Sequence, residues 1–127
     1  MSDIVLDASA LLAVLRSERG AEEVERRLEG ASIGAVNLSE VVAKLSAEGA
    51  PEAEIRSAIA RLELAVRAFD EEQAYAAGML RGSTRKLGLS FGDHACLALA
   101  HLSHATALTA DRSWSRLELD VAIEVIR

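Results

Sequence analysis

The sequence predicts an α/β protein, a three-layer α/β/α sandwich built around a central parallel sheet. Short apolar runs alternate with helical segments along the whole chain, and strands separated by helices form parallel sheets that helices cover on both faces. Half of the residues are apolar but only 3% are aromatic, so the core is expected to be aliphatic. The expected strands cover residues 3–7, 32–36, 66–69, 106–109 and 121–126.

The helical segments follow from apolar spacing and from residues that begin or end helices. Ile55, Ile59 and Leu62 recur at helical spacing after Pro51, which suits a first helical position. Gly88 is typical of a helix C-terminus. The expected helices cover residues 9–16, 21–29, 38–48, 52–64, 70–86 and 93–104, and a short turn contains Trp114.

Length and composition exclude several classes of protein. At 127 residues, the chain is expected to be one domain, residues 1–127, without repeats or linkers. No apolar run approaches the roughly 20 residues that span a membrane, and Met1-Ser2-Asp3 lacks a signal-peptide pattern, so a cytoplasmic location is expected. Cys96 is the only cysteine, which excludes an internal disulfide. The net charge of −6 argues against a nucleic-acid binder with a basic surface, but not against an enzyme whose acids hold metal ions.

Four carboxylates are expected at one edge of the predicted sheet. Asp7 and Asp111 follow strand-like runs, whereas Glu40 and Asp93 lie in the first turns of helices. Strand C-termini and the N-termini of the following helices share the edge at which α/β proteins bind ligands. Carboxylates that converge there repel one another unless a cation lies between them. Hard oxygen ligands select Mg²⁺ or Mn²⁺.

Each acid also has a structural interpretation. Asn37 to Glu40 fits a capping box with Asn37 as N-cap, and Ser90 to Asp93 fits another. Asp7 favours a helix N-terminus with Ser9 as cap, and Asp111 suits an ordinary turn. These interpretations do not explain why all four acids fall on the same predicted edge.

The local sequences around the four acids resemble the PIN-domain family, most closely the small VapC-type toxins of toxin–antitoxin pairs. The resemblance rests on Val5-Leu6-Asp7-Ala8-Ser9, Val36-Asn37-Leu38-Ser39-Glu40, Leu89-Ser90-Phe91-Gly92-Asp93 and Leu108-Thr109-Ala110-Asp111-Arg112, in that order. It implies Mg²⁺- or Mn²⁺-dependent hydrolysis of RNA, a small antitoxin partner and a homodimer. The nucleophile would be a water whose pKa the metal lowers.

The resemblance also implies roles for individual residues. Asp7, Glu40, Asp93 and Asp111 match the family's acidic quartet, which would be both catalytic and metal-binding. Ser9 matches the polar residue that supports the first Asp, and Asn37 a polar position ahead of the Glu. Many relatives carry Thr at the position of Ala8, and an acid followed by Phe where this chain has Ser113 and Trp114. We expect the antitoxin to pack against helices 9–16 and 38–48 and to place a cation near the quartet.

Other interpretations remain open at the level of sequence. A PIN-like module could bind RNA or protein without cutting, although no member of the quartet is missing. A receiver-type phosphoacceptor needs a second acid beside the first and a late Lys, and neither is evident. Histidines at 94, 101 and 104 lack the i, i+4 pair of a zinc helix. Arg81, Arg85 and Lys86 form either a rim for RNA phosphates or a solvated helix end, and the stripe of Ala74, Gly78 and Gly82 predicts a kink or a dimer contact.

Overall fold

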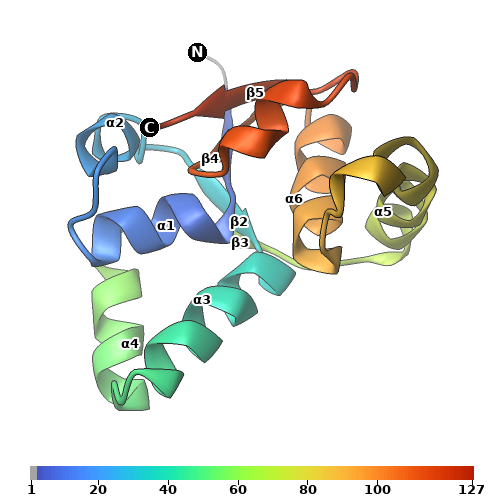
Figure 1. Ribbon diagram of the computed structural model, residues 1–127. Helices are drawn as coiled ribbons and strands as arrows, with labels where there is room; N and C mark the ends of the chain where they lie inside the picture. The colour runs from blue at the N-terminus through green and yellow to red at the C-terminus, as the bar shows by residue number, and fades with distance from the viewer. Residues whose placement is uncertain (1–2) are drawn as a thin grey trace.

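A computed structural model describes residues 3–127 as one five-stranded, fully parallel sheet between two layers of helices, which confirms the predicted fold class (Figure 1). The strand order is β3-β2-β1-β4-β5, with β1 at the centre. The strands are β1 (Ile4–Leu6), β2 (Ser32–Gly34), β3 (Ala65–Arg67), β4 (Thr106–Thr109) and β5 (Ala122–Val125). The helices are α1 (Ala8–Leu15), α2 (Ala21–Glu25), α3 (Ala35–Ala47), α4 (Glu52–Ala60), α5 (Glu71–Thr84) and α6 (Phe91–Leu102), with 3-10 turns η1 (Arg85–Leu87) and η2 (Arg112–Arg116).

Alternate residues of β1 point into two different apolar cores. Ile4 and Leu6 pack with α1 and with Val24 of α2 on one face of the sheet. Val5 packs with α6 and with the fully buried Trp114 on the other face. This period-2 alternation explains why a three-residue strand is fixed in register by the burial of both faces.

Several helices begin or end at residues other than those expected. Gly34, the last residue of β2, is also the N-cap of α3, so the strand runs into the helix without a loop. Asn37 therefore lies inside the helix. The capping-box interpretation required Asn37 to be the N-cap, so that interpretation is wrong. The second helix ends at Glu25, earlier than expected, and α6 begins at Phe91, two residues before Asp93. In residues 3–127, no helix is both long enough and apolar enough to cross a bilayer.

The sheet order places a crevice at the C-terminal ends of β1 and β4. The chain runs from β1 outward to β2 and β3, and then returns to the other side of β1 with β4 and β5. Neighbouring strands whose connections leave in opposite directions open a crevice at their carboxyl ends, where ligands of α/β proteins bind. Asp7 follows the end of β1 and Asp111 lies two residues beyond β4, on the two sides of this crevice.

Candidate active site

Asp7 is a buried carboxylate directly after the C-terminal end of β1. Its relative exposure is 5%, and its backbone N–H donates to Leu108 O at 2.9 Å, which ties it to the end of β4. Asp7 is the N-cap of α1, yet its side chain accepts no capping hydrogen bond. Ser9 lies inside that helix, so the interpretation of Ser9 as the cap is wrong. Helix capping therefore does not account for the carboxylate.

Two hydroxyl groups hold the Asp7 carboxylate instead. Ser9 Oγ donates to Asp7 Oδ2 at 2.6 Å, and Thr109 Oγ1 donates to the same oxygen at 2.9 Å. Ser9 Oγ also accepts from the Ala110 N–H at 2.9 Å, and Thr109 Oγ1 accepts from the Asp111 N–H at 3.1 Å. Thr109 is a supporting residue that the sequence reasoning missed. A polar residue at the end of a buried strand was the available signal.

Glu40 is positioned by a buried amide and by a glycine. Asn37 Nδ2 donates to Glu40 Oε1 at 2.9 Å and to Gly92 O at 3.0 Å, which joins α3 to α6. Asn37 is fully buried, and its Oδ1 has no hydrogen-bond partner within residues 3–127. A buried polar atom left unpaired costs stability. Asn37 therefore bonds both the Glu40 carboxylate and the α6 backbone while one of its own polar atoms stays unpaired within residues 3–127.

Gly92 leaves the space in which the Glu40 carboxylate lies. A Cβ at position 92 would stand 2.2 Å from Glu40 Oε2 and 2.4 Å from Cδ. Contacts this short do not occur between non-bonded atoms, so any side chain here would displace Glu40. The sequence reasoning did not identify Gly92 as a position that shapes the site, because nothing in the sequence shows which helix faces it.

Asp93 forms the capping box that was expected from the sequence. Its charge also acts on Asp7 and Glu40. Asp93 Oδ2 accepts from the Ser90 N–H at 2.9 Å, and Ser90 Oγ accepts from the Asp93 N–H at 3.2 Å, which is the expected capping box. Capping uses one carboxylate oxygen. The negative charge remains within reach of Asp7 and Glu40, as their pKa values indicate.

Burial and mutual repulsion raise the pKa values of two of these acids. Burial is the main cause for Asp7; hydrogen bonds from Ser9 and Thr109 oppose it, and the charge of Asp93 adds to it. Burial also raises the pKa of Glu40; the Asn37 hydrogen bond opposes it, and the charges of Asp7 and Asp93 add to it. The same three carboxylates help to raise the pKa of the buried Cys96 thiol, after burial itself. The negative charges of Asp7, Glu40 and Asp93 therefore influence the pKa values of groups in the same buried region.

Asp111 lies apart from these three acids. Its exposed side chain caps η2, where Asp111 Oδ1 accepts from the Ser113 N–H at 2.9 Å and from Ser113 Oγ at 2.7 Å. The turn interpretation is thus correct for its local structure. Asp111 connects to the cluster only through its backbone N–H, which donates to Thr109 Oγ1. The structure brings together Asp7, Glu40 and Asp93, and it places Asp111 at the rim.

The donor set fits a hard divalent cation, although the side chains do not form a closed cage. In the part of the chain that the structure describes, no three acidic, histidine or cysteine side chains are arranged as a ready-made metal site. However, all candidate ligands are oxygens, and a cation would relieve the repulsion that raises the pKa values of Asp7 and Glu40. An open arrangement suits Mg²⁺, which keeps several waters when it binds few carboxylates.

Other residues singled out in the sequence are the histidines and the glycines of α5, and the structure gives no metal-binding role to either group within residues 3–127. His94 Nε2 lies 2.8 Å from Thr84 Oγ1, and His101 Nδ1 lies 3.2 Å from Asp120 O. On α5, the helix continues through Gly78 and Gly82, and a Cβ at either position would meet nothing within 4 Å. Close packing inside the described chain therefore does not explain either glycine.

The family model of the PIN domain matches residues 4–119, which is most of the chain. This chain belongs to the PIN domain family. The family generally uses divalent metal ions, and its toxins are typically nucleases. No curated protein is similar enough in sequence to count as a relative.

Solved structures share the fold of this PIN domain at low sequence identity. The complex VapBC2 from Rickettsia felis, bound to a DNA fragment from its promoter, contains a chain that is 15% identical, with a TM-score of 0.77 over 97% of this chain and 98% of that one. A toxin–antitoxin complex from Klebsiella pneumoniae matches at 17% identity and TM-score 0.73, covering 98% of both chains. FitAcB from Neisseria gonorrhoeae matches at 22% identity and TM-score 0.67, covering 94% of this chain and 95% of that one.

Proposed function

We propose that this PIN domain is a Mg²⁺- or Mn²⁺-dependent endoribonuclease, and that it is the toxin of a toxin–antitoxin pair. The observation that carries the proposal is the buried Asp7 carboxylate, which shares the crevice with Glu40 and Asp93 and has no cation of the chain bonded to it within residues 3–127. Such a cluster costs stability unless it binds a cation. Family membership supplies the expectation of nuclease chemistry.

Each residue of the site has a proposed role. Asp7, Glu40 and Asp93 would bind the divalent cation directly or through water, and Asp111 would complete the site from the rim. When bound, the cation supplies an activated water and offsets the charge that develops on the scissile phosphate. Ser9 and Thr109 fix one oxygen of Asp7, and Asn37 fixes one oxygen of Glu40, so that one oxygen of each carboxylate would be left for the cation.

The reaction test compares metals and acids. Purified protein should cleave single-stranded RNA with Mg²⁺ or Mn²⁺ and should stop in EDTA, whereas Ca²⁺, whose coordination is looser, should support cleavage poorly. Asp93→Asn should abolish cleavage, and the exposed Asp120→Asn should cleave as the wild type does. Full activity in EDTA would exclude the metal mechanism. Metal-dependent RNA binding without cleavage would instead favour a non-catalytic PIN module.

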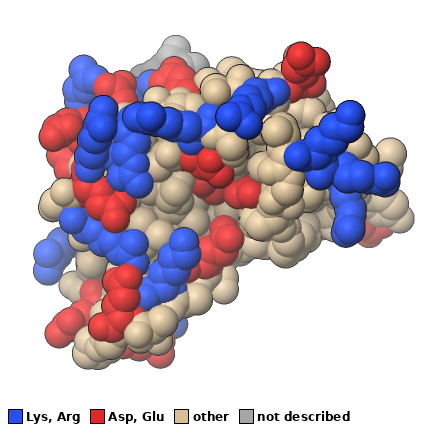
Figure 2. Space-filling view, in the orientation of Figure 1, with Lys and Arg blue, Asp and Glu red and all other residues tan. Residues whose placement is uncertain are grey.

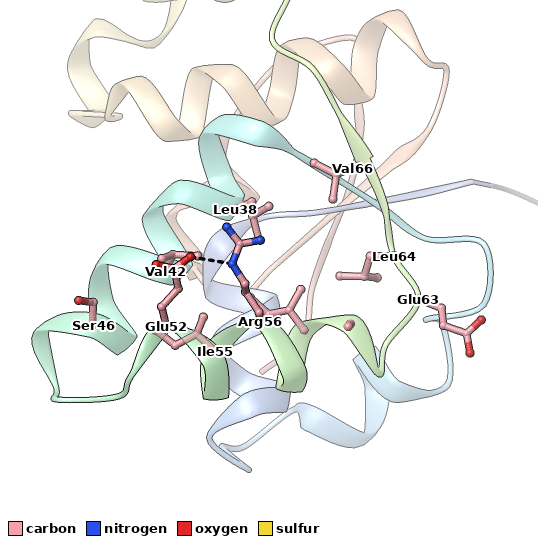
Figure 3. A pocket seen from close by; sticks show the side chains of 11 residues that line it. Leu38, Val42, Ser46, Glu52, Ile55, Arg56, Glu63, Leu64 and Val66 are labelled. Atoms are coloured by element: carbon pink, nitrogen blue, oxygen red, sulfur yellow. Dashed lines mark hydrogen bonds and ion pairs between the residues drawn. The ribbon is translucent and has the colours of Figure 1, made fainter.

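An apolar groove beside α3 is the proposed seat of the antitoxin (Figure 3). Its volume is about 530 Å³, and apolar side chains of α3, α4 and β3 line it, among them Leu38, Val42, Ile59 and Val66. The expectation from sequence was that the antitoxin packs against helices 9–16 and 38–48, and of these two only 38–48, within α3, lines the groove. In the structure α1 is largely buried under α2 and α3, so α4 and β3 form the other wall.

The groove has the features that an amphipathic helix recognises. Apolar side chains form its floor, and the ion pair of Glu52 and Arg56, with Arg56 Nε 2.7 Å from Glu52 Oε2, lies on its rim. Leu38 lies in the same turn of α3 as Glu40 but on another face of the helix, so a partner in the groove would reach the acid cluster only by passing around the first turn of α3. A basic side chain on that part of the partner would neutralise the carboxylates.

A homodimer is also proposed, through the outer face of α5. Tyr75 and Met79 lie one helical turn apart on this face, and their relative exposures are 70% and 80%. In residues 3–127 they are two of the five large apolar side chains left exposed. Neighbouring exposed apolar residues of this size are typical of subunit contacts.

A further inference from the structure

A second cleft lies beside the acid cluster, between α5 and the first turn of α6. Its volume is about 650 Å³. Its lining combines aromatic and cationic side chains in a way that the apolar groove beside α3 does not. The residues that matter to its chemistry are Phe69, Gly78, Arg81, Arg85, Phe91 and His94.

Phe91 presents an aromatic surface to this cleft. It is an apolar residue at the first position of α6, yet 59% of it is exposed. Its ring packs edge-to-face against Phe69, with ring centroids 5.5 Å apart and an interplanar angle of 85°. Phe69 thus fixes the orientation of Phe91 and leaves much of the Phe91 ring free to contact another planar group.

Arg81 and Arg85 place positive charge along the same cleft, one helical turn apart. Neither forms an ion pair with any acid in residues 3–127, whereas Arg16, Arg26 and Arg27 are each paired with a glutamate. Lys and Arg side chains gather over the region of α5 and η1, and a band of uncharged residues separates them from the acidic patch in the middle of the same face (Figure 2). The cleft is therefore positive although the chain as a whole is acidic.

Hydrogen bonding holds the two walls of the cleft together. Thr84 Oγ1 donates its proton to Leu80 O at 2.9 Å, so at its 2.8 Å contact with His94 it can only accept, and His94 Nε2 must donate. Gly78 leaves space along the α5 wall, because a Cβ there would meet nothing within 4 Å. These features describe an open cleft with fixed walls.

The first turn of α6 joins the cleft to the proposed active site, since it gives Phe91 and His94 to the cleft and Gly92 and Asp93 to the site. Phe91 immediately precedes Gly92, whose Cα faces the Glu40 carboxylate, and Asp93 follows. An RNA strand that binds at the acid cluster would have to follow the first turn of α6 to reach the Phe91 ring. Aromatic faces that stack bases, next to cations that follow a phosphate backbone, characterise sites for single-stranded nucleic acid.

We propose that this cleft binds single-stranded RNA next to the scissile phosphate, with one base stacked on Phe91 and the adjoining phosphates paired with Arg81 and Arg85. The proposal rests on the proposed ribonuclease function and adds the residues that position the substrate. RNA fits better than a protein partner, because the two arginines have no carboxylate partner and the aromatic face is solvent-exposed rather than enclosed in an apolar groove.

Binding can be measured apart from cleavage. In the Asp7→Asn background, which is expected not to cut, fluorescence anisotropy would give the Kd of a single-stranded RNA of about twelve nucleotides. Phe91→Ala should weaken binding about 5- to 150-fold, as the loss of one base–aromatic stack does, and Phe91→Tyr should retain it. The Arg81→Gln/Arg85→Gln double variant should lower the slope of log Kd against log salt by about 1.4, as the loss of two phosphate contacts to a single strand does.

Matched controls separate these effects from general changes in charge or packing. Arg19→Gln/Arg26→Gln removes the same charge from the end of the molecule near α2, far from α5, and should change neither the affinity nor the cleavage rate (Figure 1). A base-free nucleotide at the stacked position should weaken binding of the Phe91 form but not of the Phe91→Ala form. Phe91→Ala should leave the salt slope unchanged, since it removes no charge.

The outcomes distinguish this proposal from the proposed function. Unchanged RNA affinity in both cleft variants, with intact cleavage by the wild type, would overturn the subsite and leave the ribonuclease standing. RNA binding that depends on Phe91, without cleavage under any metal condition, would overturn the ribonuclease and leave the subsite. A change in oligomeric mass instead of RNA affinity would identify the cleft as a subunit contact and would also overturn the proposal.

Discussion

At Asp7, a carboxylate is buried beside two hydroxyl groups, those of Ser9 and Thr109, which donate hydrogen bonds to one of its oxygens. The local sequence explains how it is placed there, since it follows a central strand and precedes a helix. Local structure does not explain why it is an acid, because no helix-capping bond uses it. Selection for a function that needs the charge is the simplest account of a group that lowers stability.

The charge of Asp7 makes a prediction about stability and pH. Burial raises its pKa above the ordinary value of 3.8, so the folded state binds the proton more tightly than the unfolded state. The ionised group therefore costs stability in full above the raised pKa, and this cost vanishes as the pH falls below about 3.8. Without metal, Asp7→Asn should be as stable as the wild type or more stable at pH 7, and the difference should shrink at acidic pH. Melting curves in EDTA would show this, and an unfolded Asp7→Asn protein would prove the carboxylate structural.

The contact between Gly92 and Glu40 allows the effect of the position of the Glu40 carboxylate on cleavage to be tested separately from the effect of its charge. Gly92→Ala should lower the cleavage rate about 10- to 100-fold, the usual effect of disturbing a group that orients a metal ligand. Glu40→Gln keeps the acceptor for Asn37 but removes the charge, so it should lose cleavage without a loss of folding.

The matched control is Gly82→Ala, where a Cβ meets nothing. It should raise the free energy of unfolding by about 1 kcal/mol, because alanine favours helix, and should leave cleavage unchanged. RNA assays and melting curves of the three variants would test both points. If Gly92→Ala cleaves at the wild-type rate, the observed position of the Glu40 carboxylate is not required for cleavage.

At the scale of elements, α3 contributes Glu40 to the acid cluster and also forms one wall of the apolar groove. Asn37 and Glu40 of α3 face α6 and the crevice, whereas Leu38 and Val42 line the groove toward α4. One helix therefore connects a proposed catalytic residue to a proposed partner site. A partner that moved α3 would displace Glu40 from Gly92.

This arrangement predicts that antitoxin binding and cleavage can be separated by mutation. Val42→Asp places a charge in the apolar groove and should weaken the complex with the antitoxin at least about 10-fold, because a charge there must be desolvated. Cleavage by the free toxin should remain close to the wild-type rate. Calorimetry with the antitoxin or its C-terminal peptide would measure the first effect and an RNA assay the second. Equal affinity of the wild type and Val42→Asp would place the antitoxin elsewhere.

The sequence predicted which elements exist better than where they begin. Alternating apolar runs were sufficient for the sheet, and the capping pattern at Ser90 and Asp93 was correct, although α6 begins at Phe91 and not at Asp93. The role of Asn37 was wrong because β2 passes into α3 without a loop, and a capping pattern cannot show that a helix has already started. Thr109 and Gly92 were missed because their roles depend on contacts across 102 and 52 residues of the chain, respectively, with Asp7 and Glu40.

At the scale of the whole molecule, the outer face of α5 predicts an oligomer. Met79→Asp should convert the proposed homodimer to a monomer at micromolar concentration, because a charge would be buried against apolar side chains of the partner. Ala53→Asp, at an exposed position on α4, should leave the mass unchanged. Sedimentation or light scattering would measure this. A wild type that is already monomeric at micromolar concentration would refute the dimer.

Metal binding should couple the acid cluster to the stability of the entire domain. A ligand that binds only the folded state stabilises it by about 2.7 kcal/mol at 100 times its Kd, which shifts the Tm of a domain of this size by roughly 10 °C. Mn²⁺ should therefore raise the wild-type Tm, and the increase should shrink in Asp7→Asn and Asp93→Asn. Asp111→Asn should reduce it less, since Asp111 is exposed and already bonded to Ser113. Equal increases in the wild type and all three variants would mean that the metal binds elsewhere on this acidic protein, because a cation held by the cluster must lose affinity when the cluster loses charge.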